Sequence, residues 1–188
     1  MIRALLVVIL FITSCAGPAR LSGTELAKDE APDFTLTDAL NGRSVSLSSL
    51  RGSVVAMSFL YTRCPDVCPL TAAQFRAAQR ALGGDADRVR FVGVSVDPDG
   101  DTPAAVREFS RAHDLGANWH YLIGSREQLR QVWGLYGIGA FAAPTDAGVS
   151  HNDAIYLIDA RGREREIVHS DIALKDFVND IRVLLQEK

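Results

Sequence analysis

Two cysteines, Cys64 and Cys68, are the residues in this sequence whose type and spacing most directly suggest chemistry. They lie in the segment FLYTRCPDVCPLT, and a proline follows each of them. A pair of thiols can form a structural disulfide, work as a redox dithiol or supply two ligands to a metal. The choice depends on the elements that position the pair and on the other ligands that the chain can bring to it.

The two cysteines stand between an apolar, strand-like run at residues 54–62 and a helical pattern at residues 70–82. We therefore expect residues 64–68 to form a loop that opens into the helix, with Pro69 at the first helical position. The unpaired N–H groups and the positive end of the helix dipole stabilise a thiolate, so at least one of the thiols is expected to have a lowered pKa.

The remaining elements follow from periodicity and turn residues. Residues 33–47 contain two short alternating stretches around Asn41 and Gly42, which predicts a β-hairpin. We expect further strands at 89–96, 120–123, 153–159 and 164–169, and further helices at 103–113, 125–136 and 171–187. This order predicts an α/β protein with a thioredoxin-like fold, in which helices flank a central mixed β-sheet and an N-terminal β-hairpin extends it. The cysteines then lie at the carboxyl end of the first core strand.

Three intervening residues separate the cysteines, one more than in thioredoxin-type reductases, and this longer spacing suits a metal held between two sulfurs. Two thiolates are soft ligands that favour Cu(I), whereas Cu(II) needs an imidazole as well. His151 is the candidate, because it lies in a polar loop before a strand that a thioredoxin-like sheet brings back beside the cysteines. The other histidines are interpreted as surface or structural residues: His113, His120 and His169.

The first fifteen residues predict export. Met1 to Arg3 is positively charged and residues 4–12 are nine apolar residues, which span about 13 Å as a helix and cannot cross a hydrocarbon layer of roughly 30 Å. The run ITSCAG resembles a lipobox, which predicts lipidation of Cys15 and leaves Cys64 and Cys68 as the remaining pair. Ordinary signal cleavage after Cys15 is the alternative. Residues 1–15 are thus expected to be a signal peptide, 16–32 a flexible tether and 33–188 the folded domain.

Three motifs, YTRCPDVCPLT, VSVDPDGDTP and HNDAIYLIDARG, occur in an order and at a spacing that resemble the Sco (SenC) family of copper-binding thioredoxin-like proteins. The resemblance covers roughly residues 30–187. It implies that Cys64, Cys68 and His151 bind one copper ion, as Cu(I) or Cu(II), and that the protein helps to mature the dinuclear copper centre of cytochrome c oxidase. Family members commonly carry Asp directly before the histidine, where this chain has Ser150. Either Ser150 or Asp153 takes its orienting role, or the site is weaker.

The family resemblance also implies partners, and the lipobox implies a location. The expected partners are the copper-centre subunit of a respiratory oxidase, and a further periplasmic copper donor or thiol reductase. A lipid anchor on Cys15 would hold the protein to a membrane of the bacterial cell envelope, facing the periplasm. A net charge of -3 without a basic block argues against a nucleic-acid partner.

A second metal pattern lies in VSVDPDGDTP. Asp97, Asp99, Asp101 and Glu108 match ligand positions of an EF-hand loop, but Thr102 replaces its required glycine and a strand precedes it where a helix is needed. We therefore interpret this segment as a turn and a helix cap near the copper site.

Two function classes remain open on the residues themselves. One is a metallochaperone, which is not a conventional enzyme, with copper on Cys64, Cys68 and His151. The other is an extracytoplasmic thiol:disulfide oxidoreductase, in which one cysteine attacks a partner's disulfide and the other resolves the product. His151 discriminates between them, because a dithiol reductase needs no third ligand.

Overall fold

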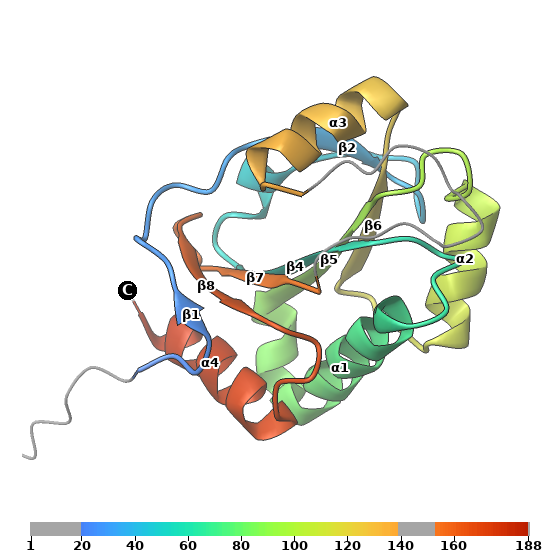
Figure 1. The fold of residues 1–188 in the computed structure, drawn as a ribbon. Helices are drawn as coiled ribbons and strands as arrows, with labels where there is room; N and C mark the ends of the chain where they lie inside the picture. The colour runs from blue at the N-terminus through green and yellow to red at the C-terminus, as the bar shows by residue number, and fades with distance from the viewer. Residues whose placement is uncertain (1–19, 139–152, 188) are drawn as a thin grey trace, which may run out of the picture.

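The computed structural model of the protein describes residues 20–138 and 153–187. Within these residues the chain forms one mixed sheet with the strand order β1-β8-β7-β4-β5-β6-β2-β3 (Figure 1). The strands are β1 (Thr24–Glu25), β2 (Thr35–Asp38), β3 (Ser44–Ser46), β4 (Val54–Leu60), β5 (Val89–Ser95), β6 (Trp119–Ile123), β7 (Ile155–Ile158) and β8 (Glu164–Val168). The helices are α1 (Val67–Leu82), α2 (Pro103–Ala112), α3 (Arg126–Leu135) and α4 (Leu174–Gln186), with short 3-10 helices at Leu47–Leu50 and Gly83–Arg88.

The centre of the sheet is β4, which pairs in parallel with β5 and antiparallel with β7. Every residue of β4 is buried. A continuous apolar run rather than an alternating one is typical of a strand that is covered on both faces. The strand therefore holds its carboxyl end, and the cysteine segment that follows, in a fixed place at the edge of the sheet.

Aromatic contacts show which helices cover which face. Phe75 of α1 lies with its ring centroid 5.1 Å from that of Phe91 in β5 and 6.4 Å from that of Phe177 in α4. On the opposite face, Tyr136 at the end of α3 packs against Phe59 of β4 at 5.7 Å. Figure 1 shows the same division, with α1 and α4 together on one side of the sheet and α3 on the other.

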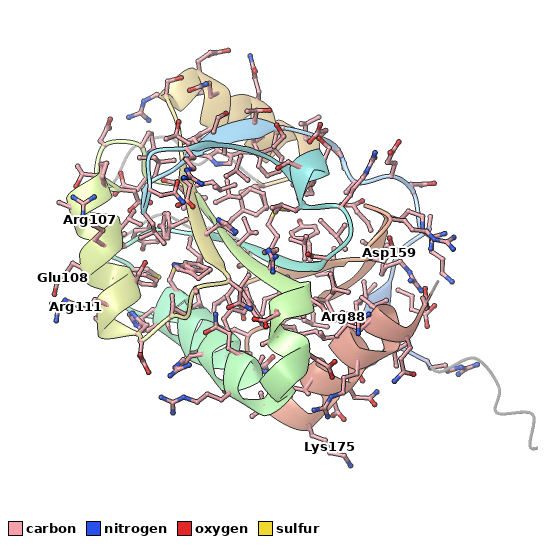
Figure 2. All side chains as sticks on the ribbon, turned by 180° about the vertical axis from the view of Figure 1, so that it is seen from behind. Arg88, Arg107, Glu108, Arg111, Asp159 and Lys175 are labelled. Atoms are coloured by element: carbon pink, nitrogen blue, oxygen red, sulfur yellow. The ribbon has the colours of Figure 1, made fainter. Side chains whose placement is uncertain are left out.

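Helix α2 illustrates why these segments fold as they do. Val106 and Phe109 are buried, while Arg107, Glu108 and Arg111 project outward from the helix (Figure 2). This spacing gives the helix one apolar side and one charged side, so that it can pack on the sheet and face solvent at once. The charged side carries both signs, and Arg111 pairs with Glu108 at 2.7 Å.

The structure agrees with most of the expected elements. Strands β2 and β3 form the predicted N-terminal hairpin, and Gly42 in its turn has a positive φ of 73°. The β7–β8 hairpin and helix α4 close the fold as expected.

Part of the predicted tether, residues 16–32, is ordered, because β1 pairs antiparallel with β8. Two residues are too few to produce a periodic pattern in the sequence, which is why this strand escaped prediction. Among the described residues, no helix combines the length and apolarity needed to cross a membrane.

Candidate metal centre

The cysteine pair lies where the first core strand gives way to a helix, as predicted. After β4 ends, the chain turns so that the backbone N–H of Cys64 donates to the carbonyl oxygen of Tyr61 at 3.2 Å. Cys64 is 8% exposed and Cys68 is 0% exposed, and neither forms a disulfide in this structure. The turn therefore presents two thiols that are shielded from bulk solvent.

Helix α1 begins at Val67, three residues earlier than the pattern predicted, so Cys68 and Pro69 belong to its first turn. The expectation that Cys68 lies in the loop before the helix is therefore wrong. Proline is tolerated there because the first N–H groups of a helix have no intrahelical acceptor, so its missing N–H costs no hydrogen bond.

This early start brings the two cysteines into contact. The backbone N–H of Cys68, one of the unpaired donors of the first turn, points to Cys64 Sγ at 3.4 Å. The hydrogen bond from the Cys68 thiol to Cys64, together with burial, raises the pKa of Cys68. For Cys68 this is opposite to the lowered pKa that its place near a helix N-terminus suggested, because burial and the neighbouring sulfur outweigh the dipole. Without a metal, the Cys68 thiol is therefore harder to deprotonate than an exposed cysteine.

The loop after β5 packs against the cysteine turn. Asp97 is 5% exposed and its carboxylate pairs with Arg63, the residue before Cys64, at 2.6 Å. A side chain at Gly100 would collide with both groups, since its Cβ would lie 2.1 Å from Asp97 Oδ2 and 2.7 Å from Arg63 Nη2. A larger residue at position 100 would therefore have to displace the Arg63–Asp97 ion pair.

The acidic residues of this loop are committed to hydrogen bonds and ion pairs. Asp101 accepts from the backbone N–H and the hydroxyl of Thr62 and from the hydroxyls of Ser95 and Tyr121. Asp99 pairs with Arg126. Thr102 Oγ1 accepts from the backbone N–H of Ala105 at 3.2 Å, which is the predicted helix cap. Sequence reasoning missed the role of Asp101, although its place in DPDGDTP drew attention to it.

The candidate third ligand, His151, lies outside the described residues, as do Ser150 and Cys15. Within the described ranges, no three His, Cys, Asp or Glu side chains gather as a metal site. The chain that follows His151 is described from Asp153 onward. Ile155 of β7 pairs with Ser58 of β4, and Ser58 Oγ donates to the carbonyl oxygen of Ala154 at 2.9 Å.

His120 and His169 have the structural and surface environments that the sequence predicted, whereas His113, expected at the surface, is partly buried with its ring 4.3 Å from that of Phe109. His120 is half-buried, with Nδ1 3.0 Å from the Asp38 carboxylate. His113 lies at the end of α2, with Nδ1 2.9 Å from the carbonyl oxygen of Phe109. His169 is exposed after β8, with Nδ1 2.6 Å from the carbonyl oxygen of Asp153.

Asp153 anchors the start of β7. Its carboxylate accepts hydrogen bonds from the backbone N–H of Ser170 at 3.2 Å and from the Ser170 hydroxyl at 2.8 Å. Asp153, one of the two residues expected to orient an imidazole, therefore ties the end of one strand to the start of its neighbour.

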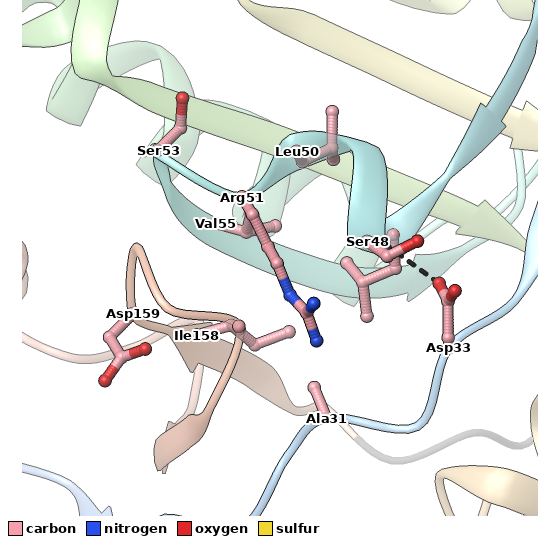
Figure 3. Close-up of a pocket in the computed structure, with 11 residues that line it drawn as sticks. Ala31, Asp33, Ser48, Leu50, Arg51, Ser53, Val55, Ile158 and Asp159 are labelled. Atoms are coloured by element: carbon pink, nitrogen blue, oxygen red, sulfur yellow. Dashed lines mark hydrogen bonds between the residues drawn. The ribbon is translucent and has the colours of Figure 1, made fainter.

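A small cavity lies at the opposite end of β4 from the cysteines, between Val55, Arg51 and Ile158 (Figure 3). Its volume is about 20 Å³, which is room for about one water molecule. It is closed off by the 3-10 helix, where the backbone N–H of Ser48 donates to Asp33. This cavity is too small for an organic ligand, and a larger, open pocket of about 370 Å³ beside β1 and the end of β8 contains neither cysteine.

Residues 22–186 match the SCO1/SenC family profile. The chain is 28% identical over 163 residues to the SCO1 protein homolog of Bacillus subtilis, covering 83% of this chain and 80% of that protein. The structure of Bradyrhizobium japonicum ScoI with copper bound is 32% identical, with a TM-score of 0.73 over 83% of this chain and 99% of that one. BsSco, described as having a disulfide switch and as a member of the Sco family of cytochrome c oxidase assembly proteins, is 26% identical, with a TM-score of 0.71 over 86% of this chain and 96% of its own. The predicted thioredoxin-like fold is thereby confirmed.

The profile spans both cysteines and nearly all of the described sheet and helices. The solved relatives share that architecture over more than four fifths of the chain. The motifs around the thiol pair and the fold that presents them therefore lead to one conclusion: the chain belongs to the SCO1/SenC family.

Proposed function

We propose that this protein is an extracytoplasmic, membrane-anchored copper metallochaperone that assists assembly of the dinuclear copper centre of cytochrome c oxidase. It carries one copper ion as cargo, as Cu(I) or Cu(II), and passes it to the copper-centre subunit of the oxidase. The observation that carries the proposal is the contact between Cys64 and Cys68 at the edge of the sheet, where the Cys68 N–H lies 3.4 Å from Cys64 Sγ. A relative that is 32% identical was solved with copper bound, which supports the choice of metal.

His151 is the proposed third ligand. The antiparallel pairing of β7 with β4 brings the start of β7 to the edge at which β4 ends. His151 precedes Ala154 by three residues, and a chain reaches at most about 3.5 Å per residue, so the two Cα atoms lie within about 11 Å. This short span supports the proposal that the imidazole of His151 binds beside the cysteine turn, and Ser150 is the neighbour proposed to orient it.

The chemistry assigned to the protein groups follows from the donor set. Two thiolates satisfy Cu(I), and the added nitrogen of His151 suits Cu(II). Cys68 must release its proton to bind, so copper loading releases protons and weakens as the pH falls. Because Cys64 and Cys68 are only slightly exposed, they are shielded until a partner's ligands approach and take the ion by exchange.

The decisive experiment is a pair of copper titrations, one in each oxidation state, on the wild type and on His151→Ala. The variant is expected to lose Cu(II) affinity by about 100-fold or more and Cu(I) affinity by much less, because thiolates alone are adequate for Cu(I). His113→Ala is the matched control, since His113 contacts only the carbonyl oxygen of its own helix among the hydrogen bonds seen here. Unchanged Cu(II) affinity and unchanged thiolate-to-copper absorption in His151→Ala would remove it from the ligand set.

A thiol:disulfide oxidoreductase that keeps partner cysteines reduced is the second candidate. The contact between Cys64 and Cys68 suits closure to a disulfide, and one relative is described as having a disulfide switch. In this function His151→Ala keeps full activity, whereas Cys64→Ser and Cys68→Ser lose it. For the metallochaperone, oxidising the pair should abolish copper binding and reduction should restore about one ion per chain, because a disulfide leaves no thiolate to bind the metal.

The anchor is proposed from the signal alone. We propose residues 1–15 as a signal peptide that ends in a lipidated Cys15, followed by a tether that β1 and the family profile shorten to about residues 16–21. The wild type is expected to partition into detergent, and Cys15→Ala to remain unprocessed or to be released as a soluble form. Recovery of the wild type as a fully soluble periplasmic protein would contradict the anchor.

A further inference from the structure

One buried carboxylate next to the cysteine turn has no role in the function proposed above. Asp101 lies in the loop between β5 and α2 and is 3% exposed. Four groups donate hydrogen bonds to it, and all four are neutral. A carboxylate offers about four acceptor positions on two oxygens, so this side chain is saturated.

One oxygen of Asp101 holds the cysteine turn. Oδ1 accepts from the backbone N–H of Thr62 at 2.8 Å and from the Thr62 hydroxyl at 2.8 Å. Thr62 is the second residue of the turn in which the Cys64 N–H donates to the carbonyl oxygen of Tyr61. Because Asp101 accepts hydrogen bonds from both the main chain and the side chain of Thr62, it fixes the position of the turn itself.

The other oxygen fastens Asp101 to the core. Oδ2 accepts from the hydroxyl of Ser95, at the end of β5, at 2.6 Å and from the hydroxyl of Tyr121 in β6 at 2.9 Å. Ser95 and Tyr121 are both 0% exposed. Asp101 thus bridges two rigid strands on one side and the cysteine turn on the other.

We propose that Asp101 is a positioning residue that sets the location of Cys64 relative to Cys68. Cys68 is already held by α1, whereas Cys64 stands on a turn between strand and helix. The bridge from β5 and β6 to Thr62 restrains that turn. The backbone around Cys64 is therefore already ordered when the two sulfurs come together. As it concerns copper, this inference rests on the proposed function, but its effect on the thiol pair does not.

The position of Asp101 argues against a role confined to the local turn. Thr102, and not Asp101, caps helix α2. Asp99, in the same turn, is exposed and pairs only with Arg126 on the surface. Asp101 alone among these residues points inward and connects three segments that are far apart in the chain.

The test uses the metal-free protein and glutathione. In the equilibrium, the reduced protein passes two electrons to glutathione disulfide, giving two glutathione molecules and the Cys64–Cys68 disulfide. Asp101→Ala is expected to lower this equilibrium constant at least tenfold, which is about 30 mV for a two-electron couple, because a loosened turn must be ordered before the disulfide can close. Asp99→Ala, the matched control in the same loop, is expected to leave the constant unchanged.

Asp101→Asn separates positioning from charge. Its amide oxygen can still accept from both donors of Thr62, while its amide nitrogen can donate to Ser95 and Tyr121. We expect it to restore the equilibrium to within about threefold of the wild type. An Asp101→Asn variant that behaves like Asp101→Ala would overturn positioning and assign the effect to charge.

A milder variant, Thr62→Val, tests whether Asp101 acts on the thiol pair through the cysteine turn and not only on the stability of the fold. Thr62→Val keeps the backbone N–H bond to Asp101 but loses the hydroxyl bond, and it is expected to shift the glutathione equilibrium in the same direction by about threefold. If Asp101→Ala does not fold, Thr62→Val provides the test in its place. An equilibrium constant with glutathione that equals the wild-type value in Thr62→Val would then contradict the proposal.

Copper provides the final comparison. The thiolate-to-Cu(II) absorption should weaken in Asp101→Ala and return in Asp101→Asn. If the wild type binds no copper, the proposed function fails, but the glutathione equilibrium still tests the positioning role. If the wild type binds copper and all variants keep its glutathione constant and absorption, the positioning role alone fails.

Discussion

Two groups of buried carboxylates beside the sheet differ in the donors that surround them. Asp101, beside the cysteine turn, accepts four hydrogen bonds. Glu166 in β8 and Asp180 in α4, both 0% exposed, lie beside one another under β1. Glu166 accepts from the backbone N–H of Gly23 at 2.8 Å, and within the described residues its Oε1 has no donor.

The comparison shows that burial alone does not decide what a carboxylate does. Burial raises the pKa of Asp101, and the bonds from Ser95 and Thr62 act against that rise. Burial raises the pKa of Glu166 to about 7, and the neighbouring Asp180 adds to the rise while only Gly23 opposes it. The first carboxylate is therefore suited to hold a turn in place, and the second to hold a proton.

The largest expected effect is the loss of Asp101. Asp101→Ala removes four hydrogen bonds and leaves buried donors such as the Tyr121 hydroxyl unsatisfied, so the free energy of unfolding should fall by about 4 kcal/mol. Urea unfolding of wild type and variant gives this value directly. A loss below about 1 kcal/mol would mean that water replaces the carboxylate, and the contrast with Glu166 would disappear.

The second effect is a dependence of stability on pH that comes from Glu166. Its pKa in the folded state is about 7 against 4.5 in a model peptide, so the folded protein keeps a proton that the unfolded chain has lost. The contribution of Glu166 to stability should therefore be complete below about pH 4.5 and fall by up to about 3 kcal/mol as the pH rises to about 7. Denaturant unfolding between pH 4.5 and 8 measures this change in the free energy of unfolding.

Glu166→Gln should flatten that fall, because its amide can still accept from Gly23 and can donate to Asp180. The groups that face Glu166 are Asp180, which also has a raised pKa from burial, and Glu25 of β1. Glu108→Gln, on the exposed side of α2, is the matched control and should keep the wild-type profile. If Glu166→Gln kept the wild-type pH profile, the proton on Glu166 would not be the cause of the pH dependence of stability.

A third prediction concerns Gly23, which lies directly over this acid pair. An added Cβ would meet Val168 Cγ1 at 2.4 Å and the carbonyl oxygen of Ile167 at 2.5 Å. Gly23→Ala should push β1 away from β8 and cost about 1–2 kcal/mol, while water that reaches Glu166 lowers its pKa. Faster hydrogen exchange of the β1 amides measures the detachment, and Gly84→Ala, with no atom near its added Cβ, is the control.

The smallest expected effect is at Asp99. Its carboxylate is 67% exposed and pairs with Arg126, which is 43% exposed. Exposed ion pairs contribute roughly 0–1 kcal/mol, so Asp99→Ala should change the free energy of unfolding by less than about 0.5 kcal/mol. A larger loss, measured by the same urea unfolding, would show that the whole loop, and not Asp101 in particular, supports the cysteine turn.

Local patterns were sufficient for much of the fold. The apolar run of β4, the turn at Asn41 and Gly42, and the amphipathic spacing of α2 each depend on neighbours within a few residues, and the structure agrees with all three. The placement of Cys64 after the strand could be predicted for the same reason, whereas the place of Cys68 inside the first turn of α1 could not. His151 stays a prediction, since it lies outside the described residues.

The sequence by itself determined the order of strands and helices, the thiol pair and its place at the end of the first core strand, because those features arise from short-range periodicity and the backbone preferences of proline and glycine. Only the tertiary structure decided the surroundings of the buried acids. Asp101 reaches Thr62 across 39 residues, and Asp180 holds Ser22 across 158. Contacts of this kind leave no periodic pattern in the sequence. A carboxylate can therefore be an exposed surface group, a hydrogen-bond acceptor that restrains a turn, or a buried group with a raised pKa, and the donors that folding brings to it decide which.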